Sequence, residues 1–410
     1  MTIAALVTGI GVVAPNGLGA DAYWPAVLDG KSGIGRITRF DPDGYPVQLA
    51  GEVRDFVARQ HLSGRILVET DHWTHMALAA ASMALDDAAA DPASLPEYGM
   101  AVATASSSGG TEFGQREIER LWSKGPRHVG AYQSIAWFYA ATTGQISIRH
   151  KMRGPCGVIS AEQAGGIDAI AQARRLIRTG TSLVVSGGTD ASLCPYGLTA
   201  QLTTGLLSTS GDPARAYLPF DAAACGYVPG EGGAILIVED GSREGGDPYG
   251  EIAGYAATFD PRPGSGRPPG LRRAIEGALA DASLSPGEVD VVFADAAAVP
   301  ELDRVEAAAI AAVFGASGVA VTAPKTMTGR LYGGGAALDV ATALLALRHQ
   351  VIPPTVGVRE VSGHHEMDLV LGRPRPGPLR NALIIARGYG GFNSALVVRT
   401  VSSSDRTRRT

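Results

Sequence analysis

Short runs of branched apolar residues alternate with long alanine-rich segments along most of this chain. The short runs have the length and composition of buried strands, whereas the longer segments repeat apolar residues at helical spacing. Such alternation indicates βαβ units on a mainly parallel or mixed sheet, so we predict an α/β fold. Strands are predicted at residues 4–7, 100–103, 183–186, 234–238, 289–294 and 382–386, and helices at 74–89, 165–179 and 336–349.

A polar passage at residues 239–249, which contains glycine and proline, divides the chain, and glycine-rich strand ends recur on both sides of it. We therefore predict two related halves, residues 1–245 and 246–402, followed by a polar and basic tail at 403–410 that is disordered. The chain has 410 residues, of which 45% are hydrophobic, and can bury a large core.

Charge and cysteine content exclude several classes of protein. The net charge of -5 disfavours nucleic acid and anionic membranes as partners. No segment has the residue order of a signal peptide or the length of an apolar membrane span, so we expect a cytoplasmic protein. The cysteines lack CxxC spacing, which indicates neither a disulfide framework nor a zinc site. All three are predicted to be small buried side chains: Cys156, Cys194 and Cys225.

Two short patterns suggest a cofactor or a metal and are disfavoured by their surroundings. Gly9, Gly11 and Ala14 have the spacing of a dinucleotide-binding fingerprint, but Pro15 stands where the helix should begin. The sequence His-His-Glu at residues 364–366 lacks a second ligand pair at suitable spacing, so a solvated loop is favoured there. We therefore expect neither an NAD site nor a metal site.

Gln163 lies on a segment with the pattern of a strand, a sharp turn and a helix N-terminus. Val158 and Ile159 give the strand, and an amphipathic helical pattern begins near Gly166. A side chain on such a turn is expected to be exposed at the positive end of the helix dipole, where a cysteine thiolate would be stabilised. Glutamine at this position cannot attack an acyl thioester. An ordinary surface residue on a strand–helix turn is the alternative interpretation.

Motifs along almost the whole chain resemble those of the ketosynthases, the condensing enzymes of the thiolase fold, and fall in the same order. The resemblance implies a thiolase-like fold, with two duplicated βαβ halves in a layered αβαβα arrangement. The motifs are VTGIGVVAPNG at 7–17, GP at 154–155, SGGTD at 186–190, LPFD at 218–221, GEGG at 230–233 and GYGGFN at 388–393.

In this resemblance the residues of the ketosynthase catalytic site are replaced. Gln163 takes the position of the nucleophilic cysteine, Asp295 and Arg330 take those of the two histidines, and Lys325 is retained. Asp295 and Arg330 are predicted to form a charge-assisted contact. An ionised carboxylate has no proton to donate to a thioester carbonyl, and arginine keeps its proton near neutral pH. The usual condensing mechanism is therefore excluded.

The sequence AEQAGG at residues 161–166 resembles the chain length factors, the catalytically silent beta subunits of type II polyketide synthases. This resemblance implies a heterodimer with a cysteine-bearing ketosynthase alpha subunit. It also implies an acyl carrier protein as the second partner. Substrates would arrive on the phosphopantetheine arm of that carrier, so no cofactor of the chain's own is expected.

The resemblance also assigns residues to the end of a product tunnel at the interface with the ketosynthase. Residues 111–122 read as a helix, and the tunnel positions match Thr111, Gly114, Ile118 and Ile135. In chain length factors, bulky residues at these positions stop the growing poly-β-keto chain early. Thr111 and Gly114 are small, which predicts a long product, a decaketide or longer. Phenylalanine at either position is expected to shorten it.

Two alternatives remain open from the sequence. The chain could be a priming subunit that decarboxylates malonyl groups on the carrier protein by means of Gln163, although such subunits need the histidines that this chain lacks. It could also be a chain length factor of a reducing, polyene-making system. The starter unit and the final metabolite depend on other subunits.

Overall fold

The structure is a computed structural model that describes residues 3–243, 247–262 and 264–401. The tail predicted at 403–410 lies outside the described residues. The predicted boundary between residues 245 and 246 falls in the undescribed stretch 244–246 and stays a prediction.

Five strands from the first part of the chain form one set, in the order β6-β5-β7-β8-β1. Strand β5 is parallel to β6 and β7, whereas β8 is antiparallel to both β7 and β1. Strands β5, β7 and β8 are buried along their whole length, which explains their apolar sequences. The bounds are β1 (Leu6–Ala14), β5 (Met100–Ala105), β6 (Cys156–Ile159), β7 (Leu183–Asp190) and β8 (Gly232–Glu239).

Five later strands repeat this pattern in the order β11-β10-β15-β16-β9, with β13 (Asp368–Leu369) outside β11. Strand β10 is parallel to β11 and β15, and β16 is antiparallel to β15 and β9. Each strand of the first set therefore has a counterpart with the same neighbours and directions. The bounds are β9 (Gly250–Phe259), β10 (Val291–Phe293), β11 (Ala320–Thr322), β15 (Asn381–Gly388) and β16 (Phe392–Arg399).

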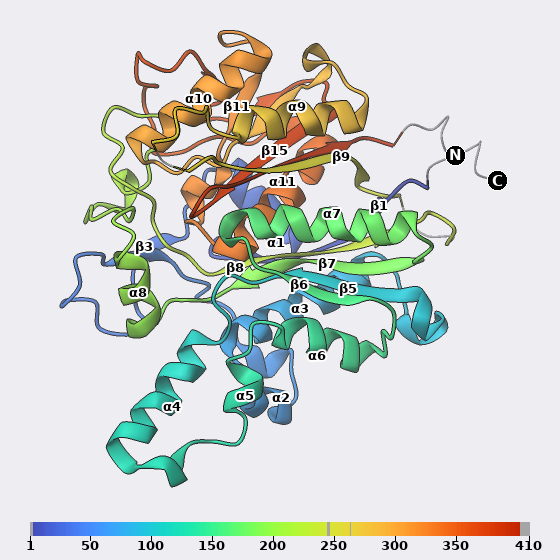
Figure 1. The fold of residues 1–410 in the computed structure, drawn as a ribbon, viewed down its shortest axis with the longest axis vertical. Helices are drawn as coiled ribbons and strands as arrows, with labels where there is room; N and C mark the ends of the chain where they lie inside the picture. Colours follow the sequence, from blue (N-terminus) through green and yellow to red (C-terminus); the bar gives the residue numbers. More distant parts are fainter. Residues whose placement is uncertain (1–2, 244–246, 263, 402–410) are drawn as a thin grey trace.

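Helices form three layers around the two sets of strands (Figure 1). Between the sets lie α7 (Gly165–Arg178) and α11 (Gly335–His349), which pack against each other. The outer face of the first set is covered by α3 (His72–Asp87) and α6 (Ala141–His150), and that of the second by α9 (Leu271–Ala282) and α10 (Pro300–Phe314). This αβαβα arrangement with duplicated halves confirms the predicted fold class.

The central helices and α3 begin and end within two residues of the predicted bounds. The pattern was clear because α11 is buried from Gly335 to Leu347 and is built of small and aliphatic residues. Close packing in this layer depends on Gly166, where an added Cβ would lie 2.6 Å from the backbone nitrogen of Ala337.

The glycines of the dinucleotide-like pattern lie inside strand β1 and serve packing. A Cβ at Gly9 would lie 2.1 Å from the carbonyl oxygen of Ala84, and one at Gly11 would lie 1.9 Å from that of Ala80. Both carbonyls belong to α3, so the glycines allow this helix to lie directly against the strand.

The remaining elements are short, except for a helix that projects from the body. Helices α4 (Thr111–Lys124) and α5 (Gln133–Ala136) form the lower part of the molecule in Figure 1. No helix of the described ranges is long and apolar enough to cross a membrane. The other elements are α1 (Ala20–Leu28), α2 (Gly64–Glu69), α8 (Pro195–Leu202), β2 (Gly17–Leu18), β3 (Ile34–Arg36), β4 (Leu49–Gly51), β12 (Val351–Ile352) and β14 (Arg375–Pro376).

The prediction that all three cysteines are buried is wrong for two of them. Cys194 is buried, but Cys156 and Cys225 are exposed. Cys156 begins β6, the last strand at one end of the sheet order, and Cys225 follows the loop after Asp221. A strand's position at the edge of a sheet depends on tertiary pairing, which the composition of the strand does not reveal.

Candidate functional site

Gln163 lies on the predicted strand–turn–helix segment, but it is not exposed as predicted. A 3₁₀ turn over Glu162–Ala164 leads directly into α7. The Gln163 side chain is completely buried, and a Cβ at Gly335 would lie 2.5 Å from its Nε2 atom. The amide fills space beneath the first residue of α11 because glycine at 335 leaves room for it. Neither amide atom has a hydrogen-bond partner among the described residues, so the side chain fills space without a polar contact.

Glu162, one residue earlier, contributes a charge that the sequence analysis missed. Its φ of 51° places it in the left-handed region, which costs a non-glycine residue about 1 kcal/mol. The carboxylate contacts Arg330 in two places, at 3.1 Å from Nε and 3.3 Å from Nη2. It also accepts a hydrogen bond of 2.9 Å from the backbone N–H of Tyr389. The only sequence signal for this role was a charged residue in the predicted turn.

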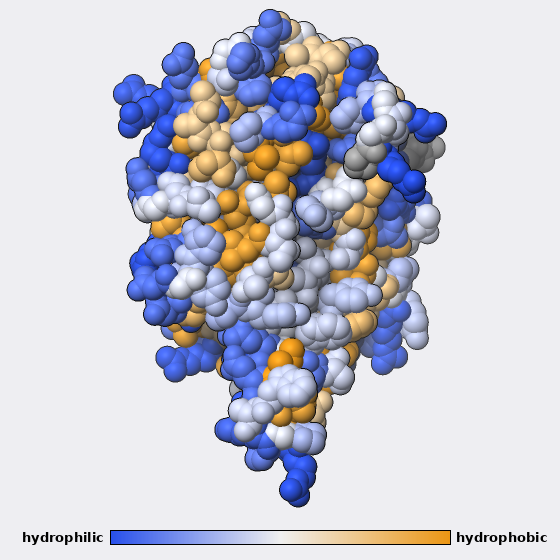
Figure 2. Space-filling view, turned by 60° about the vertical axis from the view of Figure 1, so that its left-hand side comes forward, coloured by the Kyte–Doolittle hydropathy of each residue, from blue (hydrophilic) through white to orange (hydrophobic). Residues whose placement is uncertain are grey.

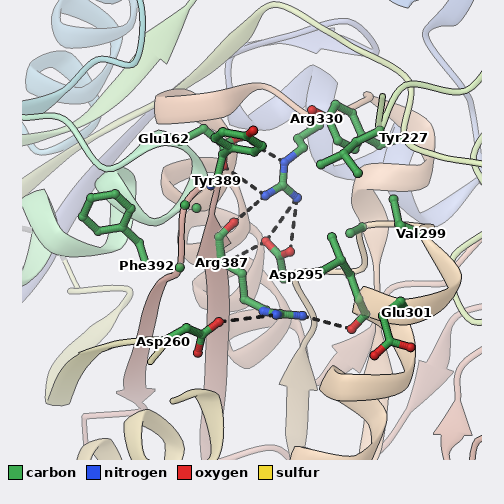
Figure 3. A pocket seen from close by; sticks show the side chains of 16 residues that line it. Glu162, Tyr227, Asp260, Asp295, Val299, Glu301, Arg330, Arg387, Tyr389 and Phe392 are labelled. Atoms are coloured by element: carbon green, nitrogen blue, oxygen red, sulfur yellow. Dashed lines mark hydrogen bonds and ion pairs between the residues drawn. The ribbon is translucent and has the colours of Figure 1, made fainter. Parts of the chain in front are cut away.

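Arg330 and Asp295 form the predicted contact at the centre of the site (Figure 3). Nη1 of Arg330 lies 3.2 Å from each carboxylate oxygen of Asp295. Nη2 donates a 2.5 Å hydrogen bond to the carbonyl oxygen of Arg387, and the ring of Tyr227 lies 5.2 Å from the guanidinium carbon. Together with Glu162, these groups engage all three guanidinium nitrogens.

The electrostatics of this cluster keep both central groups charged. Burial by itself raises the pKa of Asp295, but the charges of Arg330 and Lys325 outweigh it and hold that pKa below its usual value. Burial by itself lowers the pKa of Arg330, but Asp295 and Glu162 outweigh it and raise that pKa. Because neither group changes protonation near neutral pH, the pair cannot act as a general acid or base.

Lys325 and Glu306 fix the backbone that carries Asp295. The Lys325 ammonium donates to the carbonyl oxygens of Ala294 at 2.7 Å and Asp295 at 3.1 Å. It also forms a 2.8 Å ion pair with Asp339 on α11. The Glu306 carboxyl group accepts the backbone N–H of Asp295 at 2.7 Å, and burial together with the Asp295 charge raises the pKa of Glu306 to about 8. Lys325 therefore holds in place the loop that carries Asp295.

A cavity of about 370 Å³ opens over the ion cluster. Its lining mixes the charged groups Glu162, Asp295, Arg330 and Arg387 with the aromatic ring of Phe392. Gln163 does not line it. Among the described residues no cluster of His, Cys, Asp and Glu side chains could hold a metal ion.

The four predicted tunnel residues lie on the projecting part of the molecule. Thr111 and Gly114 are buried at the base of α4, whereas Ile118 is 43% exposed and Ile135 on α5 is 42% exposed. The helix is held at its start by Asp71, whose carboxylate accepts a 2.6 Å hydrogen bond from the backbone N–H of Phe113.

An apolar patch surrounds the outer pair of tunnel residues. Eight of the fifteen exposed large hydrophobic side chains in the described parts of the chain lie between residues 118 and 148. Figure 2 shows apolar side chains gathered on the narrow lower part of the molecule. A patch of this kind marks a surface that another protein covers. It consists of Ile118, Trp122, Tyr132, Ile135, Trp137, Phe138, Tyr139 and Ile148.

Comparison with known families agrees with the fold. Residues 4–243 match the family described as Beta-ketoacyl synthase, N-terminal domain, and residues 249–359 match Beta-ketoacyl synthase, C-terminal domain. The chain belongs to the beta-ketoacyl synthase family. Within this family it groups with the ketosynthase beta subunits, or chain length factors, of type II polyketide synthases.

Three similar proteins illustrate the place of this chain within the beta-ketoacyl synthase family. The tetracenomycin polyketide synthase ketoacyl synthase beta subunit of Streptomyces glaucescens is 60% identical, over 96% of this chain and 98% of the relative. The structure of the ishigamide ketosynthase/chain length factor aligns with a TM-score of 0.89 at 27% identity, over 98% of this chain and 100% of that chain. A type II acyl-carrier protein in complex with its ketosynthase bound to the hexaketide gives a TM-score of 0.87 at 26% identity, with the same coverage.

Replacing Arg330 with methionine should destabilise the protein strongly. The substitution keeps a long side chain but leaves two buried or partly buried carboxylates, Asp295 and Glu162, without their cation. Breaking a buried ion pair in this way costs about 3–5 kcal/mol of unfolding free energy. Urea denaturation of the two proteins measures the difference.

The matched control is Arg304→Met, which removes the cation of an exposed pair with Glu301 on α10. Its unfolding midpoint should stay where it is in the unmodified protein, because exposed pairs contribute little. Equal effects of the two substitutions would show that the central cluster does not stabilise the fold.

Proposed function

We propose that this chain is the chain length factor of a type II polyketide synthase. It makes no bond itself, pairs with a cysteine-bearing ketosynthase and sets the length of the poly-β-keto chain. The observation that carries the proposal is the buried cluster of Arg330 with Asp295 and Glu162. The resemblance to ketosynthases assigns two of these residues, Asp295 and Arg330, to the positions of the catalytic histidines. A permanently charged and fully engaged cluster offers neither a nucleophile nor a proton donor.

The partner surface has two components. The first is the apolar patch around α4 and α5. The second is strand β6, which among the described residues pairs with β5 alone and is exposed at Cys156 and Gly157. A strand with a free edge readily accepts a strand from another chain. The similarity to the ishigamide ketosynthase/chain length factor and to the tetracenomycin beta subunit supports a ketosynthase as the occupant.

Thiol labelling tests this surface. Partial burial raises the pKa of the Cys156 thiol. The residue is nevertheless exposed in the single chain, so it should react with excess maleimide. In the pair with the ketosynthase, Cys156 should be protected because the partner covers β6. Peptide mass spectrometry after timed labelling gives both rates.

Cys225 provides an internal control, because it is exposed and lies on a different segment, next to Ser208. It should react at the same rate in the free and paired states, whereas Cys194 should stay unlabelled in both. Equal labelling of Cys156 with and without the partner would rule out β6 as part of the interface.

The four tunnel residues belong to this proposal. Thr111 and Gly114 lie where α4 leaves the body, and Ile118 and Ile135 lie within the apolar patch. A partner seated on the patch would therefore close a space beside the start of α4, where Thr111 is a small side chain. This supports a tunnel that ends at the interface and a long product, a decaketide or longer.

Replacing Thr111 with phenylalanine should shorten the product. The ring adds a volume of the order of several methylenes to a buried position and should close the end of the tunnel. The measurement is the product mass made by the reconstituted pair from malonyl-loaded carrier protein. Lys124→Phe is the control, because it adds the same ring at the exposed end of α4. An unchanged mass for Thr111→Phe in an assembled pair would defeat the tunnel assignment.

The rival function, decarboxylation through Gln163, is disfavoured by the burial of that side chain and by its absence from the cavity lining. Gln163→Met keeps the volume and removes the amide, so carbon dioxide release and product yield should stay unchanged in the pair. Gln163→Ala should reduce stability through the lost volume. Loss of carbon dioxide release in a folded and paired Gln163→Met variant would favour the priming subunit instead.

The substrate is proposed to arrive on the phosphopantetheine arm of an acyl carrier protein. The complex of a type II acyl-carrier protein with its ketosynthase supports this partner. This chain is 60% identical to the tetracenomycin subunit and 27% identical to the ishigamide chain. We propose an aromatic type II system, with a reducing, polyene-making system as the alternative. A cytoplasmic location stays a prediction.

A further inference from the structure

The space next to Gly114 is not empty. A Cβ built on Gly114 would lie 2.9 Å from Cδ1 and 3.6 Å from Nε1 of Trp137. The indole therefore lies directly against the backbone of α4. Any side chain at position 114 would have to displace it, since real Cβ atoms do not approach other atoms this closely.

The backbone of Trp137 is fixed beside the start of α4. Its N–H donates to the carbonyl oxygen of Gln133 at 3.2 Å, and its carbonyl oxygen accepts the N–H of Gly110 at 3.2 Å. Gly109 has a φ of 66°, and a Cβ there would lie 2.6 Å from the carbonyl oxygen of Trp137. A Cβ at Gly110 would lie 2.0 Å from the carbonyl oxygen of Ala136. Three glycines thus admit this segment and its ring.

One face of the indole remains free. Trp137 is 53% exposed and lies within the apolar patch, beside Phe138 and Tyr139. An aromatic ring that is packed on one side and free on the other can form part of a wall. The ring supplies, from the segment after α5, the bulk that α4 itself lacks at Gly114.

We propose that Trp137 is the residue that determines product length at this end of the tunnel, and that Gly114 is small because it seats the indole. The inference rests on the proposed function as a chain length factor. This proposal changes the interpretation of Gly114 that was based on the sequence. Glycine at this position does not lengthen the tunnel, because the indole occupies the space beside it. The size and position of the Trp137 ring set the limit instead.

The test compares variants in the reconstituted pair with the cognate ketosynthase, with malonyl-loaded carrier protein as substrate and product mass as the readout. Trp137→Ala should lengthen the product by at least one two-carbon unit, because removal of the ring opens space of the order of several methylenes. Tyr98→Ala is the control, since that ring is 74% exposed and lies outside the apolar patch. It should leave the product unchanged.

A second variant keeps the proposal testable when Trp137→Ala fails to pair. Gly114→Ala should push the indole toward its free face and shorten the product while the pair still assembles. An unchanged product for Gly114→Ala in an assembled pair would overturn the proposal. The double variant Gly114→Phe with Trp137→Ala places a ring back in the same space and should bring the product toward its original length.

Thr111→Phe distinguishes failure of this inference from failure of the proposed function. A product that shortens with Thr111→Phe but does not change with Trp137→Ala would leave the chain length factor in place and remove Trp137 from the wall. A product that changes with neither variant would contradict both proposals.

Discussion

The guanidinium of Arg330 joins the two halves of the molecule through buried ion pairs. Glu162 comes from the turn before α7 in the first half, and Asp295 comes from the loop after β10 in the second. Taking these charges out of water is costly, and the cost is met because all three nitrogens of the guanidinium have partners. The cluster fixes the relative positions of segments that are distant in the sequence. Apolar side chains in the same place would fix them less precisely, because their contacts have no preferred direction.

Neighbouring side chains hold the geometry of the cluster and of the turn beside it. Lys325 and Glu306 hold the backbone around Asp295, while Gln163 fills the space beneath α11 that Gly335 leaves. The cavity above the cluster remains open, but the groups at its base are charged and engaged. The chain thus combines the ketosynthase fold and its central helices with a cavity whose base is formed by engaged charges.

Function then depends on surfaces far from this cluster. The apolar patch around α4 and α5 and the free edge of β6 both lie on the first half, and both are incomplete in a single chain. The contact between Gly114 and Trp137 lies in the same region. The proposed wall of the tunnel and the buried cluster therefore lie on different elements.

The amino-acid sequence by itself determined the α/β class, the duplicated architecture through its motifs, and the opposite charges of Asp295 and Arg330. These features follow from local periodicity or from residue identity at matched positions, and the structure contains all of them. Elements without strong periodicity, such as β16 and the alanine-rich α10, were not predicted, because their apolar residues make sense only beside the neighbours they pack against.

Only the tertiary structure decided which of these side chains are exposed and which touch. It buried Gln163, exposed Cys156 at a sheet edge, turned Glu162 toward Arg330 across a separation of 168 residues, and placed the Trp137 ring against Gly114. Each of these outcomes depends on how closely two distant backbones approach. Because side chains fill whatever space that approach leaves, local sequence could name the residues of this site but not their contacts.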